Sequence, residues 1–118
     1  MRLVRRPPFD LAFCLNHLLL KCLWVRWAAR RFLAAFDTLL EAYLGAVDWE
    51  PAAAIESRTV HLLPGLLLAR VDGKSPVEYL TRERDKAVVR PVARSLLADP
   101  TDRLAEIRQF WAKAIEET

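Results

Sequence analysis

The sequence predicts an all-α domain of five to seven helices in an orthogonal bundle, and three observations support this prediction. Leucine, alanine and arginine are the commonest residues, glutamate is also frequent, and all four have high helix propensity. The chain has only three glycines and no runs of β-branched residues that would supply a sheet. Apolar residues make up 53% and charged residues 28% of the 118 residues, which fits one folded domain with a modest core.

We expect a single helical domain, with a basic N-terminal tail over residues 1–8 and the helical bundle over residues 9–118. The formal net charge is +3, but residues 1–31 hold seven basic groups and one acid. A basic end of this kind can contact nucleic acid or an anionic surface, or it can face acidic parts of the same fold. No nucleic-acid recognition motif accompanies it, so we expect no nucleic-acid partner.

The stretch from Pro7 to Trp24 is expected to lie at the centre of the fold. Asp10 is expected to cap a helix from Asp10 to about Trp24, because its carboxylate can accept from the free N–H groups of the first turn. Apolar residues at three- and four-residue spacing predict that one helix face is buried. The opposite side is also apolar, which indicates a helix covered on most sides; the residues there are Phe13, Cys14 and Leu20.

The basic start and the apolar run after it resemble a signal peptide only superficially. Asp10 and Pro7-Pro8 interrupt the start, Lys21 ends the run without a cleavage site, and the run is shorter than the roughly 20 residues of a membrane span. Cys14 and Cys22 lie two helical turns apart, beyond disulfide reach, and are interpreted as small core residues in a reducing compartment. We therefore expect a cytoplasmic protein.

A second helical pattern follows Trp24 and is expected to end near Gly45. The sequence leaves open whether a break falls near Arg26 or one long helix runs through. The next helix is predicted from Pro51 to Leu63, with proline at its first position, and Pro64 should kink or restart it. The apolar stripe of the second pattern should face the core; it comprises Trp27, Phe32, Phe36, Leu39, Leu40 and Tyr43.

The clearest turn in the chain spans Val71 to Pro76. Its Asp-Gly pair predicts a positive φ, and its Ser-Pro pair should begin a short helix from Pro76 to Leu80. Thr81 is expected to cap a further helix from Arg82 to about Ala98, with a bend at Pro91.

A last amphipathic helix is predicted from Asp102 to Glu116, with Thr101 as its cap. Its inward stripe is expected to be Leu104, Ile107, Trp111 and Ile115.

Motifs that would identify a metal site or a hydrolase are missing from the sequence. His17 and His61 are the only histidines, and neither occurs in a metal-binding spacing such as HExxH. Three glycines spread along the chain do not build a phosphate-binding loop, and no serine lies in a GxSxG motif. We assign no catalytic residue and no metal ligand.

The best candidates for substrate binding are Arg70, Asp72 and Lys74. They cluster on a tight turn that follows an apolar helix, and polar groups on such loops often contact ligands. A purely structural interpretation is also open, in which Asp72 caps the turn and Arg70 pairs with Asp72 or Glu78.

Two stretches carry a resemblance to a known family. Phe9-Asp10-Leu11-Ala12-Phe13, followed by LNHLLLK, resembles the helix just after the catalytic and metal-binding loops of aminoglycoside phosphotransferases. This protein-kinase-like family includes choline kinases and methylthioribose kinases. The stretches AFDTLLEAYLGAVDWEP and LLPGLLLARVDGKSPVEYL are similar to the C-terminal helices of a bacterial branch. The resemblance covers the chain from Pro8 onward.

The resemblance implies a role for Asp10 and an incomplete active site. In the family, the aspartate that Asp10 matches braces the catalytic loop, and the helices behind it form the acceptor side of the larger lobe. The nucleotide-binding lobe, the His-Gly-Asp loop and the metal-binding aspartate would precede Pro8, and none occurs in Met1 to Pro7. ATP and Mg²⁺ are therefore implied for intact relatives only, and we expect no catalysis by this truncated chain alone.

Three interpretations remain open. The first is the C-terminal helical subdomain of a small-molecule phosphotransferase, with an uncovered apolar patch around Phe9, Phe13 and Leu20 that favours self-association. The second is a non-enzymatic helical module that binds a partner protein through exposed apolar surface. The third, which the sequence favours least, is a membrane-surface protein that uses its arginine-rich start with Trp24 and Trp27.

Overall fold

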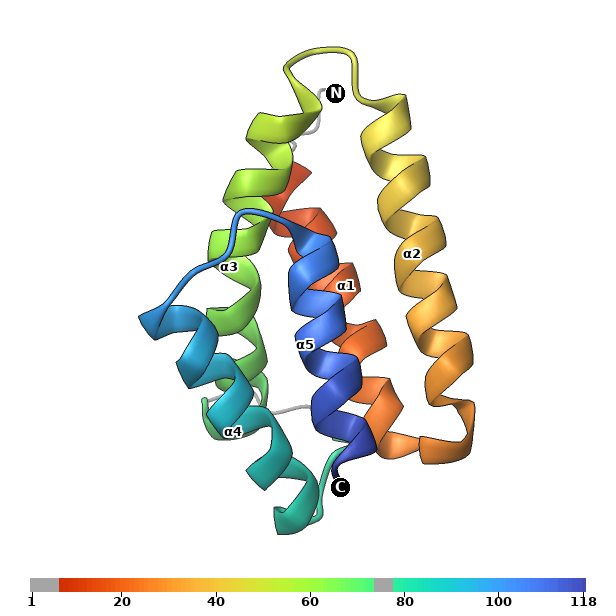
Figure 1. The fold of residues 1–118 in the computed structure, drawn as a ribbon, viewed down its shortest axis with the longest axis vertical. Helices are drawn as coiled ribbons and strands as arrows, with labels where there is room; N and C mark the ends of the chain where they lie inside the picture. Colours follow the sequence, from red (N-terminus) through yellow and green to blue (C-terminus); the bar gives the residue numbers. More distant parts are fainter. Residues whose placement is uncertain (1–6, 74–77) are drawn as a thin grey trace.

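The structure is a computed structural model that describes residues 7–73 and 78–118. Its α-helices are α1 (Pro7–Trp24), α2 (Ala29–Ala46), α3 (Ala52–Asp72), α4 (Glu83–Ala98) and α5 (Leu104–Glu116), and a 3-10 helix over Arg26–Ala28 joins α1 to α2 (Figure 1). No strand occurs in these two described segments. The all-α prediction is confirmed, with five α-helices.

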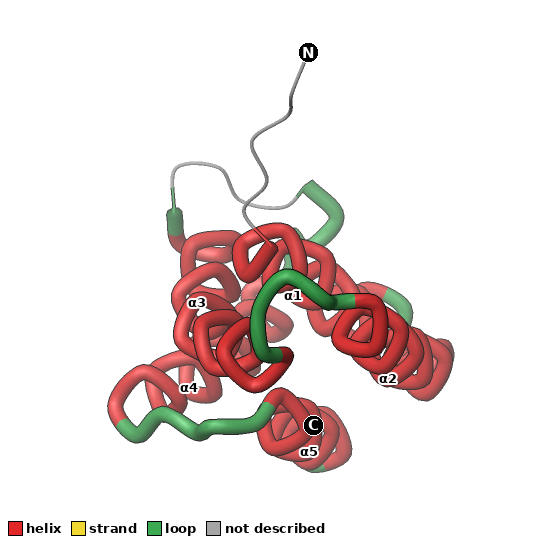
Figure 2. Tube along the Cα trace, turned by 90° about the horizontal axis from the view of Figure 1, so that it is seen from above, coloured by secondary structure: helices red, strands yellow, loops and turns green. Residues whose placement is uncertain are grey.

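Helix α1 lies at the centre of the bundle. It packs most extensively against α3 on one side and α2 on the other, and α5 lies across the same core (Figure 2). Leu11, Leu15 and Leu19 are at most 1% exposed, and they belong to one core cluster with buried residues of α2, α3, α4 and α5. The fully buried Trp111 of α5 donates an indole hydrogen bond to the Leu19 carbonyl, at 3.0 Å.

The start of α1 differs from the prediction. The helix begins at Pro7, so Asp10 lies within the first turn and is not the capping residue. Proline explains this start, because its fixed φ and missing N–H suit the first helical positions. Asp10 is still placed to complement the positive end of the helix dipole.

The covering of α1 is less complete than predicted. Phe13 is 39% exposed and Cys14 is also exposed, whereas Leu20 is fully buried. The prediction that both cysteines are core residues is therefore wrong for Cys14 and confirmed for Cys22. Burial raises the pKa of the Cys22 thiol to about 11, so this thiol is protonated at neutral pH.

A break separates α1 from α2, which answers the question that the sequence left open. The chain turns at Val25 and forms the 3-10 helix before α2 begins. The predicted stripe of α2 largely faces the core, since Phe36 is buried and Phe32 packs against the core. Trp27 departs from that stripe, because it lies in the turn and not in α2, and it is 80% exposed.

Two prolines lie inside helices without ending them. Helix α3 continues through Pro64 to Asp72, so the predicted restart at Pro64 is wrong. Helix α4 likewise continues through Pro91. A proline removes one backbone hydrogen bond, and the packing of α3 offsets that loss, since Leu63, Pro64 and Leu67 are buried.

Neither predicted threonine cap forms. Helix α4 begins at Glu83 after Arg82, and helix α5 begins at Leu104, two residues later than predicted. Thr101 instead makes a local turn, in which its hydroxyl accepts from the N–H of Arg103 at 2.9 Å. The start of α5 is capped from another helix, because the Glu56 carboxylate of α3 accepts from the Leu104 N–H at 2.9 Å.

The turn after α3 is only partly within the described residues. Gly73 has φ −84°, so the predicted positive φ is wrong. Gly73 is required for a different reason, because an added Cβ would lie 2.3 Å from the Ala69 carbonyl oxygen. Residues 74–77, with the start of the predicted helix Pro76 to Leu80, lie outside the described residues, and residues 78–80 are not helical.

Alanine at two glycine positions should change stability in opposite directions. Gly73→Ala should destabilise by about 1–2 kcal/mol, because the new methyl group collides with backbone. Gly65→Ala should stabilise by about 0.5–1 kcal/mol, because Gly65 lies inside α3 and nothing is within 4 Å of the added Cβ. Urea unfolding of both variants checks this pair, and equal effects would contradict it.

Candidate functional site

Arg70, the first predicted binding residue, lies in the last turn of α3 and reaches towards α1. Its guanidinium carbon is 5.8 Å from the centre of the Phe13 ring, a cation–π contact. Its Nε atom is buried and has no hydrogen-bond partner. Asp72 does not pair with Arg70, which was one of the predicted pairings, because a residue of another helix holds the Asp72 carboxylate.

Asp72, the second predicted binding residue, is held by α4. Arg90 donates to both of its carboxylate oxygens, from Nε at 2.9 and 3.0 Å and from Nη2 at 2.8 Å. Arg90 also pairs with Glu83. These hydrogen bonds lower the pKa of Asp72 and raise that of Arg90, so both groups stay charged at neutral pH. Lys74 lies outside the described residues, so Arg70 and Asp72 alone are placed.

A row of aromatic side chains runs along one face of α1 and includes Arg70's partner, Phe13. The ring centres of Phe9 and Phe13 are 6.3 Å apart, and those of Phe13 and His17 are 4.8 Å apart. Tyr79 extends the row, with its ring 6.1 Å from His17 and 5.2 Å from Trp24. We call these five residues the aromatic row. Sequence reasoning missed it, although Phe9, Phe13 and His17 recur at four-residue spacing.

His17 is the polar centre of the aromatic row. Its Nδ1 lies 2.8 Å from the Tyr79 hydroxyl. Burial, with smaller contributions from the positive charges of Arg70 and Lys21, lowers the pKa of His17. Burial also raises the pKa of Tyr79 to about 12. At neutral pH the tyrosine hydroxyl can therefore donate to a neutral imidazole, which attaches the chain after α3 to α1.

The lowered pKa of His17 predicts a loss of stability in mild acid. The unfolded chain binds the proton more readily, so stability should fall as the pH drops below 6.5, towards the folded-state pKa. Urea unfolding at about pH 7.5 and about pH 5 measures this. His17→Gln should make the decrease smaller, whereas His61→Gln, at an exposed residue, should leave it unchanged. If acid lowered the stability of both variants equally, His17 would not be the group responsible for the pH dependence.

An apolar hollow adjoins the start of the aromatic row. It has a volume of about 510 Å³ and lies between the first turn of α1 and the middle of α3. Phe9 is 44% exposed and Leu62 is 39% exposed beside it. The expected patch is therefore present at Phe9 and Phe13 but does not include Leu20, which turns into the core. The full lining comprises Pro8, Phe9, Arg58, His61 and Leu62.

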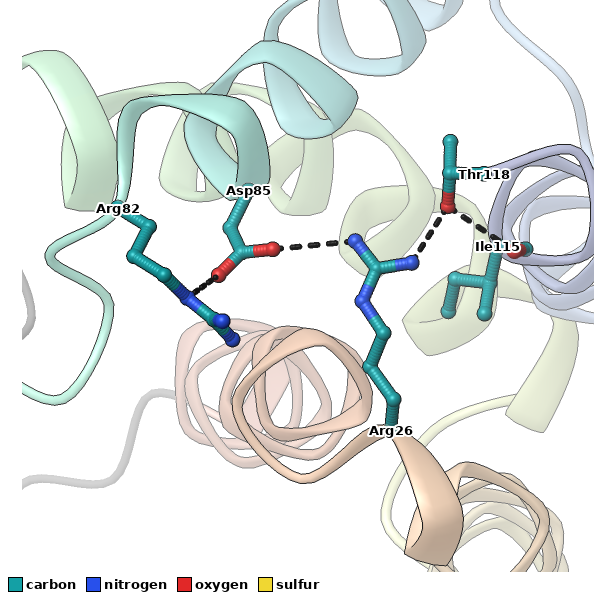
Figure 3. A network of polar contacts seen from close by, with 5 residues as sticks. All are labelled: Arg26, Arg82, Asp85, Ile115 and Thr118. Carbon is teal, nitrogen blue, oxygen red and sulfur yellow. Dashed lines mark hydrogen bonds and ion pairs between the residues drawn. The ribbon is translucent and has the colours of Figure 1, made fainter.

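The opposite end of α1 is fixed by a charged network (Figure 3). The Asp85 side chain, only 3% exposed, accepts from Arg26 Nη2 and from Arg82 Nε, both at 3.0 Å. Arg26 also donates to the Thr118 hydroxyl. The network joins the turn after α1 to the start of α4 and to the last residue after α5.

Within residues 7–73 and 78–118, no three histidine, cysteine or acidic side chains are grouped as a metal site would need. In the same segments, no helix has the length and apolar character to cross a bilayer. Comparison with known proteins found no matching family model, no matching characterised protein and no matching solved structure.

Proposed function

We propose that the chain is the C-terminal helical subdomain of a small-molecule phosphotransferase, whose intact relatives transfer the γ-phosphoryl group of ATP to a hydroxyl. Its five helices would correspond to the orthogonal bundle on the acceptor side of the larger lobe. The Phe9–Phe13 stretch and the Leu62–Leu80 stretch, which resemble that family, support this proposal.

One structural observation supports the proposal most directly. One face of α1 is partly uncovered, since Phe9 is 44% exposed and Phe13 is 39% exposed, and Phe9 also lines the apolar hollow. In the family, the chain that precedes this helix carries the catalytic loop and packs there. Exposed apolar surface of this kind marks a place where another part of a protein binds.

The side chains have separate roles under this proposal. Asp10, exposed in the first turn of α1, corresponds to the aspartate that braces the catalytic loop in intact relatives. Arg70, Asp72 and Lys74 belong to the acceptor side. Arg70 has a polar atom without a partner, whereas Asp72 is neutralised by Arg90. Arg70 is therefore the stronger candidate for contact with an acceptor.

Two linked experiments test the proposal. Phosphotransfer from ATP to a panel of amino alcohols and sugars should stay at background for the purified chain, since its 118 residues contain no His-Gly-Asp loop. A longer chain translated from the in-frame DNA upstream of Met1 should contain a His-Gly-Asp loop and should phosphorylate a member of the panel. Turnover by the short chain, or upstream DNA without that loop, would refute the proposal.

The second candidate is a non-enzymatic helical module that binds a partner protein, and the closed core favours it. Within the described residues, each of the five helices has a fully buried side chain, namely Leu15, Phe36, Ile55, Val89 and Trp111. A core that closes by itself predicts a sharp, reversible thermal transition from one defined species. A broad transition or aggregation would instead favour the incomplete subdomain.

A further inference from the structure

The turn between α1 and α2 exposes tryptophan beside positive charge. Trp27 is 80% exposed and Trp24 is 49% exposed, although large apolar side chains usually cover each other. The Arg31 guanidinium carbon lies 5.9 Å from the centre of the Trp27 ring. Arg30, next to Arg31 in the first turn of α2, is also exposed. We call Lys21, Trp24, Trp27, Arg30 and Arg31 the α1–α2 corner.

The positive charge of this corner is not neutralised within the described part of the chain. No carboxylate of residues 7–73 and 78–118 lies within ion-pair distance of Arg30 or Arg31. The sequence from 11 to 36 carries four basic residues and no acid. Arg26 is excluded from the corner, because Asp85 and Thr118 already hold it (Figure 3).

We propose that the α1–α2 corner docks on an anionic lipid surface, with Trp27 inserted at the level of the headgroups. Tryptophan and tyrosine are the residues that favour the membrane–water interface, and Trp24 has Tyr79 as its ring neighbour. Arginine and lysine close to an anionic leaflet add attraction that decays within a Debye length. The charge of the corner is thus complementary to such a surface, and the proposal does not depend on the phosphotransferase assignment.

The shape of the corner favours a lipid surface over a protein partner. The corner is the connection between two antiparallel helices and lies at one end of the bundle (Figure 1). An indole with four-fifths of its surface exposed needs a deep pocket in a protein partner, whereas a bilayer interface accepts it without a matching shape. The contact is peripheral, because no described helix can span a bilayer.

Co-sedimentation of the full chain with lipid vesicles tests the proposal. Vesicles of phosphatidylcholine with added phosphatidylserine should bind the chain, vesicles of phosphatidylcholine alone should bind it more weakly, and salt should release it. Arg30→Ala with Arg31→Ala should weaken binding about thirtyfold. Trp27→Ala should weaken it about tenfold.

Matched variants at distant sites serve as controls. Trp49→Ala removes a 52% exposed tryptophan between α2 and α3, at the other end of α2. Arg94→Ala with Arg103→Ala removes two exposed arginines near the α4–α5 connection. Both should bind vesicles like the unmodified chain, and thermal melts should show that all variants fold.

Three results would overturn the proposal. The first is no binding to the mixed vesicles, and the second is equal loss in the corner and control variants. The third is binding of a polyglutamate peptide by the corner without binding of vesicles, which would assign the corner to an acidic protein partner.

Discussion

Replacing Trp111 with alanine should lower the free energy of unfolding by about 4 kcal/mol. The indole is fully buried where α5 meets α1, and its N–H donates to the Leu19 carbonyl at 3.0 Å. The substitution therefore leaves a large cavity and also removes the indole hydrogen bond to that carbonyl. Because a domain of this kind is stabilised by about 5–15 kcal/mol in total, the substitution should remove between about a quarter and four-fifths of its stability. Urea unfolding followed by far-UV circular dichroism measures the change.

Two control variants separate the causes of that loss. Trp111→Phe keeps most of the volume but removes the hydrogen bond, so it should cost about 2 kcal/mol. Trp49→Ala, at a residue that is 52% exposed, should change stability by less than about 0.5 kcal/mol. A Trp111→Ala variant as stable as Trp49→Ala would mean that α5 does not dock on α1 through this residue.

Replacing Asp85 with alanine should cost about 3 kcal/mol, the second largest effect that we expect. Its buried carboxylate holds Arg26 and Arg82 and so connects the turn after α1 to the start of α4 (Figure 3). This loss of stability is small for breaking a buried ion pair. The reason is that Arg26 and Arg82 are 33% and 53% exposed, so water can solvate their charges once Asp85 is removed. Thermal and urea unfolding both report the loss.

The control for Asp85 is Asp99, an aspartate at the other end of α4. Asp99→Ala removes an exposed carboxylate just after α4, and it should change stability by less than about 0.5 kcal/mol. Added salt should weaken the difference between the two variants only slightly, since a buried pair is poorly screened. If the two variants were equally stable, the Asp85 network would not contribute measurably to the stability of the fold.

Local sequence signals predicted the helices well and their ends less well. Hydrophobic periodicity places α1, α4 and α5 within about three residues, because the spacing of buried side chains is a property of each helix by itself. Caps were predicted at Thr81 and Thr101, yet α5 is capped by Glu56 of a different helix. A cap supplied by a distant residue has no local signal. The continuation of α3 through Pro64 likewise has no local signal, because it depends on the packing of α3 against other helices.

The candidate site was predicted only in part. Arg70 and Asp72 were chosen because they flank one turn, but the structure directs Arg70 to Phe13 and Asp72 to Arg90. The aromatic row depends on Tyr79, which is 62 residues from His17 in the sequence. Such pairings arise only when helices pack, so residue types and spacing could not supply them.

The sequence by itself determined the all-α class, the central helix and most of the core, because these follow from helix propensity and from periodic burial along single segments. Tertiary structure alone decided which polar and aromatic groups meet. It placed Trp27 on an outer turn, buried Asp85 between two arginines and left Phe9 uncovered beside α3. The physical reason is that exposure and pairing depend on neighbours from distant segments, which only the packed bundle brings together.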